Sequence, residues 1–93
     1  MAAELEQVVN IGPKLAAGLR EVGIQSLDEL VSHGSIEAWE LLRAAGLFDC
    51  CSSMFALEGA VQGVRWHHLP RELRQELRAY VNAAGSTRAL SDG

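Results

Sequence analysis

The sequence has 93 residues, of which 48% are apolar and 22% are charged, and its formal net charge at pH 7 is −4. This length allows one domain with a single small core, and the composition is too apolar for a disordered chain. The acidic balance argues against strong, non-specific duplex binding, which usually requires a basic surface. Residues 1–49 carry three basic and eight acidic side chains, whereas residues 50–93 carry five and four. Attraction to phosphate is therefore expected to be local, and to favour the second half.

Export signals and metal-binding patterns are not evident. No apolar run approaches the roughly 20 residues that span a bilayer, and the acidic start MAAELEQ lacks a signal-peptide pattern, so we expect a cytoplasmic protein. The only cysteines, Cys50 and Cys51, are adjacent. Neighbouring cysteines are badly placed for a disulfide, and no Cys–His spacing matches a zinc site. We expect both to be reduced and partly buried, with no metal and no cofactor.

Helical spacing and helix-breaking residues recur along the first half. Residues 3–9 are predicted to form a short first helix. Pro13 begins a second helix, because the N–H that proline lacks would be unpaired in a first turn, and Gly23 ends it. Ser26 followed by Glu29 is a capping box that opens a third helix.

The next two helices differ in how their apolar residues are distributed. Ser35 is predicted to cap a fourth helix, in which Ile36, Trp39 and Leu42 form an apolar stripe. Ser52 or Ser53 is predicted to start a fifth helix, SMFALEGAVQG. Because this segment is apolar on nearly every side, we expect it at the centre of the core.

The last helix is predicted to begin at Pro70 and to end at Gly85. Its expected inward-facing residues are Leu69, Leu73, Leu77 and Val81. Residues 86–93 are small and polar and are expected to form a mobile tail. The predicted fold is therefore all-α: residues 1–85 form a compact bundle of five or six short helices with a helix-hairpin-helix-like N-terminal half.

The turn Asn10-Ile11-Gly12-Pro13-Lys14 is the first candidate site. Gly12 lacks a Cβ, so another backbone could approach it closely. The N–H groups that open the following helix point outward at the positive end of its dipole, where a phosphate oxygen fits, and Lys14 adds a charge. The alternative is a structural corner between two packed helices. Asn10 favours that alternative, since DNA-binding hairpins commonly have glycine there, and Pro13 removes one donor.

A basic stripe on the last helix is the second candidate. Arg71, Arg74 and Arg78 lie on one face, while Glu72 and Glu76 lie on another. Like charges four residues apart each cost a few tenths of a kcal/mol in a helix, so the segregation needs a cause. The arginines could meet phosphates or an acidic partner. Equally, they could pair with the acidic first half of this domain, or simply be solvated.

The segment VRWHHLP is the third candidate, and we interpret it as structural. Trp66 is expected to fill the core at the base of the last helix, and the adjacent His67 and His68 are expected to point in different directions, which does not suit a shared metal. The chain shows no nucleophile–base pair, Walker-type loop or converging carboxylates. We therefore expect no enzymatic activity and no small-molecule substrate.

Three stretches together resemble a known family. These are NIGPKLAAGLREVGIQSLDEL, GSIEAWELLRAAG and ALEGAVQGVRWHHLP. Their order and spacing resemble the C-terminal domain of the TfoX family, also called Sxy, over residues 8 to about 80. The set of motifs is specific, although each piece alone is weak.

This resemblance implies an all-helical domain with a helix-hairpin-helix-like first half. Family members are bacterial regulators of natural competence that promote transcription of DNA-uptake genes, together with a cyclic-AMP-responsive activator. Fuller members also carry an N-terminal domain with its own sheet, which this stretch does not contain. A stand-alone relative and a fragment of a two-domain regulator both fit.

Two functional hypotheses follow. In the first, the domain touches DNA phosphates through Asn10, Ile11, Gly12 and Lys14, with help from the basic stripe; so few contacts would bind weakly and with strong salt dependence. In the second, the same surfaces dock a transcription activator, another protein or a second copy of the chain. The acidic net charge favours protein interaction, and the hairpin favours DNA.

Overall fold

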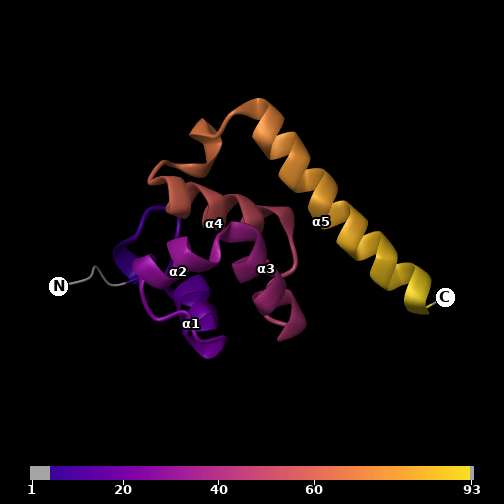
Figure 1. Ribbon diagram of the computed structural model, residues 1–93, viewed down its shortest axis with the longest axis horizontal. Coiled ribbons are helices and arrows are strands. Elements are labelled where there is room, and N and C mark those ends of the chain that lie inside the picture. Colours follow the sequence, from indigo (N-terminus) through magenta and orange to yellow (C-terminus); the bar gives the residue numbers. More distant parts are fainter. Residues whose placement is uncertain (1–4, 93) are drawn as a thin grey trace.

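The computed structural model describes residues 5–92, with side chains described for residues 5–84. Within this range the chain forms five α-helices and two short 3-10 helices, and no strand, which confirms the all-α prediction (Figure 1). In chain order they are η1 (Leu5–Gln7), α1 (Pro13–Glu21), α2 (Leu27–His33), α3 (Ser35–Ala44), α4 (Cys51–Gln62), η2 (Trp66–His68) and α5 (Arg71–Asp92).

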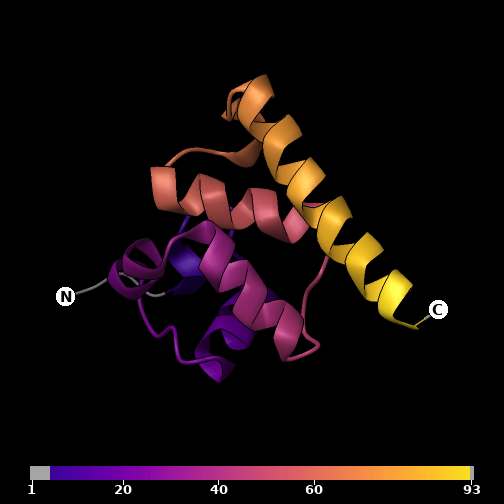
Figure 2. The same ribbon diagram turned by 45° about the vertical axis from the view of Figure 1, so that its right-hand side comes forward.

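Helix α4 lies at the centre of the fold. It packs against α2, α3, α5 and η2, and it lies between the α1–α3 group and α5 in both views (Figures 1 and 2). Its Met54 and Leu57 are fully buried and Phe55 nearly so. The prediction that this nearly all-apolar helix occupies the core is confirmed. Among the described residues, no helix is both long enough and apolar enough to cross a membrane.

Local signals set most of the helix ends. Helix α1 begins at Pro13 as predicted, and Gly23 follows its end with a φ of +93°. The Ser26 hydroxyl accepts from the Glu29 amide at 3.2 Å, which confirms the predicted cap of α2. The Glu29 carboxylate accepts in return from the amide of Gln25 at 2.9 Å, one residue earlier than in the standard capping box.

The predicted N-cap of α3 and the predicted first residue of α4 are wrong. The N-cap of α3 is Gly34, whereas the hydroxyl of Ser35 donates to the Glu58 carboxylate at 2.5 Å. Helix α4 begins at Cys51 instead of at a serine, and the Ser53 hydroxyl donates back to the carbonyl of Cys50 at 2.8 Å. In both cases the serine follows the cap position and bonds elsewhere.

Other predictions fail because tertiary packing overrides the local pattern. Ile36 was expected in the apolar stripe of α3, yet it is 43% exposed, since no element of the described chain covers the first turn on that side. The first helix reduces to the 3-10 turn Leu5–Gln7 within the described residues; positions 3 and 4 lie outside them. The β-branched Val8 and Val9 that follow are poor helix formers.

The last helix extends beyond its predicted end. Helix α5 continues through Gly85 to Asp92. A glycine weakens a helix by about 1 kcal/mol without forbidding it, and the alanines before Gly85 favour helix while no proline follows. The mobility of residues 86–93 stays a prediction, since Gly93 and the side chains of residues 86–92 lie outside the described structure.

An ion pair fastens the N-terminal 3-10 turn to α1. The Arg20 guanidinium donates to both oxygens of the Glu6 carboxylate, each at 2.7 Å. Such a bidentate contact is among the stronger charge-assisted hydrogen-bond arrangements. The Arg20 hydrogen bond, above all, lowers the pKa of Glu6 from 4.5 to about 2.

This pair predicts a pH-dependent stability. Because folding depresses the pKa of Glu6, its contribution is complete above pH 4.5 and is lost as the pH falls through about 2. We expect the wild type to exceed Glu6→Gln in free energy of unfolding at pH 7, and the difference to shrink between those two pH values. Urea unfolding at matched pH measures it. A difference that is equal at pH 7 and pH 2 contradicts the assignment.

Candidate functional site

The side chain of Asn10 ties the opening turn to a segment more than fifty residues away. Asn10 has a φ of +72°, a left-handed conformation that asparagine tolerates better than most residues. Its amide nitrogen donates to the carbonyl of Val64 at 2.8 Å. Its amide oxygen accepts from the backbone N–H of Trp66 at 3.1 Å. The side chain therefore satisfies a donor and an acceptor of the segment between α4 and η2.

Helix α4 leaves room for this contact at Gly59. A Cβ at position 59 would lie 2.3 Å from the Asn10 amide nitrogen and 2.7 Å from the Val64 carbonyl oxygen. Both distances are impossible for real atoms, so the contact requires glycine. Three segments thus meet at what we call the Asn10 junction, formed by Asn10, Gly59, Val64 and Trp66.

The junction separates the residues of the predicted phosphate site. Asn10 faces inward, and Ile11 is 4% exposed and part of the core. Gly12, Pro13 and Lys14 remain on the surface. Gly12 has an ordinary extended backbone, φ −93° and ψ −178°, and gives α1 no side-chain cap. A Cβ there would meet nothing within 4 Å, so the start of α1 is open to an approaching group.

A groove runs beside Lys14. Its volume is about 470 Å³, within the usual range for sites that bind a ligand or a short peptide segment. Its lining residues are Lys14, Ala17, Gly18, Glu21, Leu47 and Phe48. Gly18 permits the close packing, since a Cβ there would lie 3.1 Å from the ring of Phe48. Sequence reasoning missed this groove, although two large apolar residues directly after Gly46 could have indicated it.

The basic stripe lines a pocket of about 240 Å³ together with Gln75. Among the side chains described, none of Arg71, Arg74 and Arg78 is in an ion pair. Pairing with a described carboxylate of the acidic first half is therefore not seen for these residues. Two carboxylates of that half, Glu6 and Glu40, pair instead with Arg20 and Arg43.

The prediction that Trp66 fills the core is wrong. It is 44% exposed, and its ring stacks on that of Phe55 with centroids 6.0 Å apart and planes 12° apart. Since Asn10 holds its backbone N–H, the ring is placed on the outer side of Phe55. His67 and His68 are exposed. Their ring centroids are 4.5 Å apart, contrary to the expectation that the two rings point in different directions. A 3-10 turn brings these neighbours together.

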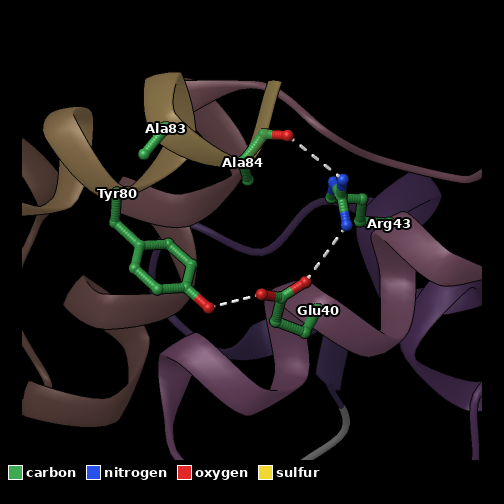
Figure 3. Close-up of a pocket in the computed structure, with 5 residues that line it drawn as sticks. All are labelled: Glu40, Arg43, Tyr80, Ala83 and Ala84. Atoms are coloured by element: carbon green, nitrogen blue, oxygen red, sulfur yellow. Dashed lines mark hydrogen bonds and ion pairs between the residues drawn. The ribbon is translucent and has the colours of Figure 1, made fainter. Parts of the chain in front are cut away.

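A polar cluster joins α3 to α5 (Figure 3). The Tyr80 hydroxyl donates to the Glu40 carboxylate, and Arg43 contacts Glu40 at 3.4 Å and the carbonyl of Ala84 at 3.3 Å. The Glu40 hydrogen bond raises the pKa of Tyr80 above its usual value. A cavity of about 280 Å³ lies here. Because these groups bond to one another, the cluster serves to hold α5 against α3.

The cysteines and the residue types that commonly bind metals give no further candidate site among the described residues. Cys51 is half-buried as predicted, but Cys50 is exposed, and both are free thiols. The carbonyl of Cys50 accepts from the Trp39 indole at 3.2 Å, which keeps residue 50 at the surface end of α4. No group of three or more His, Cys, Asp or Glu in the described part of the chain could hold a metal ion.

Comparison with known proteins assigns the family. The model of the TfoX C-terminal domain matches residues 1–81. The chain belongs to the TfoX C-terminal domain family. No curated protein matches it. The motifs NIGPK and LEGAxxGxxW, on which the resemblance rested, supply Asn10, Gly59 and Trp66 of the junction.

Two crystal structures are similar to this TfoX C-terminal domain. An uncharacterized protein from Listeria monocytogenes, in a triclinic form, is 37% identical with a TM-score of 0.86, over 89% of this chain and 94% of that one. A protein of unknown function from Listeria monocytogenes, in a tetragonal form, is 38% identical with a TM-score of 0.82, over 86% and 98%.

The junction predicts which glycines matter for stability. Gly59→Ala should lower the free energy of unfolding by about 2–3 kcal/mol, because the added methyl group displaces Asn10. Asn10→Ala should cost about 2 kcal/mol through two lost hydrogen bonds and an unfavourable φ. Gly12→Ser is the matched control and should be neutral or slightly stabilising, since serine is a good N-cap. Chemical denaturation measures all three; equal effects at positions 12 and 59 would contradict the junction.

Proposed function

We propose that this TfoX C-terminal domain is a non-enzymatic regulatory module that acts by binding another protein in the groove beside Lys14. The family is of the regulatory type. The observation that supports the proposal is the lining of the groove, in which Leu47 and Phe48 lie together with one cation and one anion. Leu47 is 37% exposed and lines the groove together with Phe48, so the two side chains form one apolar surface.

The chemistry of the groove favours a protein over a phosphate. Glu21 shares the groove with Lys14 and would repel an anion, and residues 1–49 carry an excess of acidic groups. An amphipathic helix suits this surface: its apolar face would cover Leu47 and Phe48, and charged side chains at its margins would pair with Lys14 and Glu21. The partner that the family suggests is a cyclic-AMP-responsive activator, with which a cytoplasmic module of this kind would act.

A second candidate function is weak contact with DNA phosphates at the start of α1. It is favoured by the open space at Gly12 and by the uncapped first turn. With Lys14 as the nearby cation, such binding would be weak and would fade as salt rises.

An amide NMR titration distinguishes the two candidates. The labelled chain is titrated with a purified cyclic-AMP-responsive activator, and separately with a short mixed-sequence duplex at low and near-physiological salt. We expect the activator to shift the amides of Ala17, Gly18, Leu47 and Phe48. Shifts that the duplex alone produces, centred on residues 11–15 and fading with salt, would favour the second candidate. No shift with either would overturn both.

Substitution of Leu47 sharpens the test. Leu47→Asp should weaken activator binding by about tenfold or more, because it places a charge in the apolar part of the groove. Val31→Asp is the control, since Val31 is 49% exposed on α2 and does not line the groove. Circular dichroism checks that both variants fold. Equal binding by the two variants would contradict the groove as the docking site, and concentration-dependent dimerisation through it would identify a second copy as the occupant.

A further inference from the structure

We propose that α5 and the segment around Trp66 form a separate site for an unpaired nucleotide, with its phosphate in the arginine pocket and its base on Trp66. The arginine pocket is the one lined by Arg71, Arg74, Gln75 and Arg78. This site shares no residue with the groove beside Lys14, so the inference does not rest on the proposed protein interaction.

The first step is the unbalanced charge of the pocket. Three guanidinium groups gather along one face of α5, and none of them is in an ion pair with a described side chain. In addition, the Nε of Arg74 is buried and has no hydrogen-bond acceptor among the described residues. Mutual repulsion and an unpaired buried donor are both unfavourable. An anion bound between the arginines would relieve both.

The second step is the continuity of the pocket with an aromatic surface. The Arg78 guanidinium lies 5.8 Å from the centroid of the Phe55 ring, and the same ring stacks with Trp66 at 6.0 Å. Phe55 therefore connects the pocket to Trp66, whose indole is 44% exposed. The Asn10 hydrogen bond to the backbone of Trp66 holds this platform in place before any ligand arrives.

The third step is the class of ligand. Arginine recognises phosphate by two parallel hydrogen bonds, and an exposed indole offers a flat face on which a base can stack. An acidic peptide would use the arginines but has no need of the indole. A duplex would present its phosphates but keeps the faces of its bases covered by their neighbours. A nucleotide whose base is free uses both parts of the site.

Fluorescence of the full-length chain tests the proposal. Trp66 is the exposed tryptophan and Trp39 is 1% exposed, so stacking of a base should quench emission from Trp66. The probes are oligothymidylate of ten nucleotides, thymidine monophosphate, a duplex of the same length, and polyglutamate. We expect saturable quenching by oligothymidylate that weakens on the order of 50-fold between about 20 and 150 mM salt, as three phosphate contacts predict.

Matched substitutions assign the contacts, measured by anisotropy of a labelled oligonucleotide. Arg74→Gln should weaken binding at least about tenfold, and Trp66→Leu by about tenfold through lost stacking. Lys14→Gln removes the same charge from the competing phosphate site at the start of α1, and if the nucleotide binds at α5 this change should alter binding less than about twofold. Thermal unfolding verifies that each variant is folded. If Trp66→Leu fails to fold, the difference in oligonucleotide binding between Arg74→Gln and Lys14→Gln still tests whether the phosphate binds in the arginine pocket.

The outcomes separate the sources of the ligand. Tight binding of the monophosphate supports a free nucleotide, and binding of oligothymidylate alone supports an unpaired strand. The proposal is overturned by binding of the duplex as tight as that of the single strand, by equally tight binding of polyglutamate, by equal losses in Arg74→Gln and Lys14→Gln, or by no quenching at low salt.

Discussion

The structure depends on one side chain that joins two ends of the fold. The two hydrogen bonds of Asn10 connect the turn before α1 to the segment between α4 and η2, across 54 and 56 residues. They require Gly59 on α4, where a methyl group would occupy the position of the amide. In this connecting segment the Asn10 side chain supplies a donor to the Val64 carbonyl and an acceptor to the Trp66 N–H, groups that a continuing helix would pair within itself. The junction therefore fixes both the entry to α1 and the approach to α5.

The same junction explains where the available surfaces lie. Because Asn10 and Ile11 turn inward, only Gly12, Pro13 and Lys14 of the opening turn remain outside, next to the groove that ends at Leu47 and Phe48. Because the backbone N–H of Trp66 donates to Asn10, the Trp66 ring lies on Phe55 at the surface. The Asn10 hydrogen bonds thus leave Asn10 and Ile11 unavailable at the first candidate site, and they leave the Trp66 ring exposed at another.

The surface charge of the domain depends on which charged side chains pair within the fold as well as on the sequence. Two carboxylates of the first half are engaged with cations within the fold: Glu6 with Arg20, and Glu40 with Arg43 and also Tyr80. The arginines of the stripe have no such partner among the described side chains. A negative net charge is therefore compatible with a local positive surface, since electrostatic attraction at close range depends on the nearest groups, and more distant charges are screened by salt.

The sequence by itself determined what depends on neighbouring residues. Pro13, the Ser26–Glu29 pair and Gly23 set helix ends through bonds within a few residues, and the apolar composition of residues 51–62 was enough to place that helix in the core. Only the tertiary structure decided the exposure of Trp66 and Ile36, the partners of Asn10 and the isolation of the arginines. These depend on groups that come together only when distant segments pack, and a local pattern holds no record of which segment will cover which side chain.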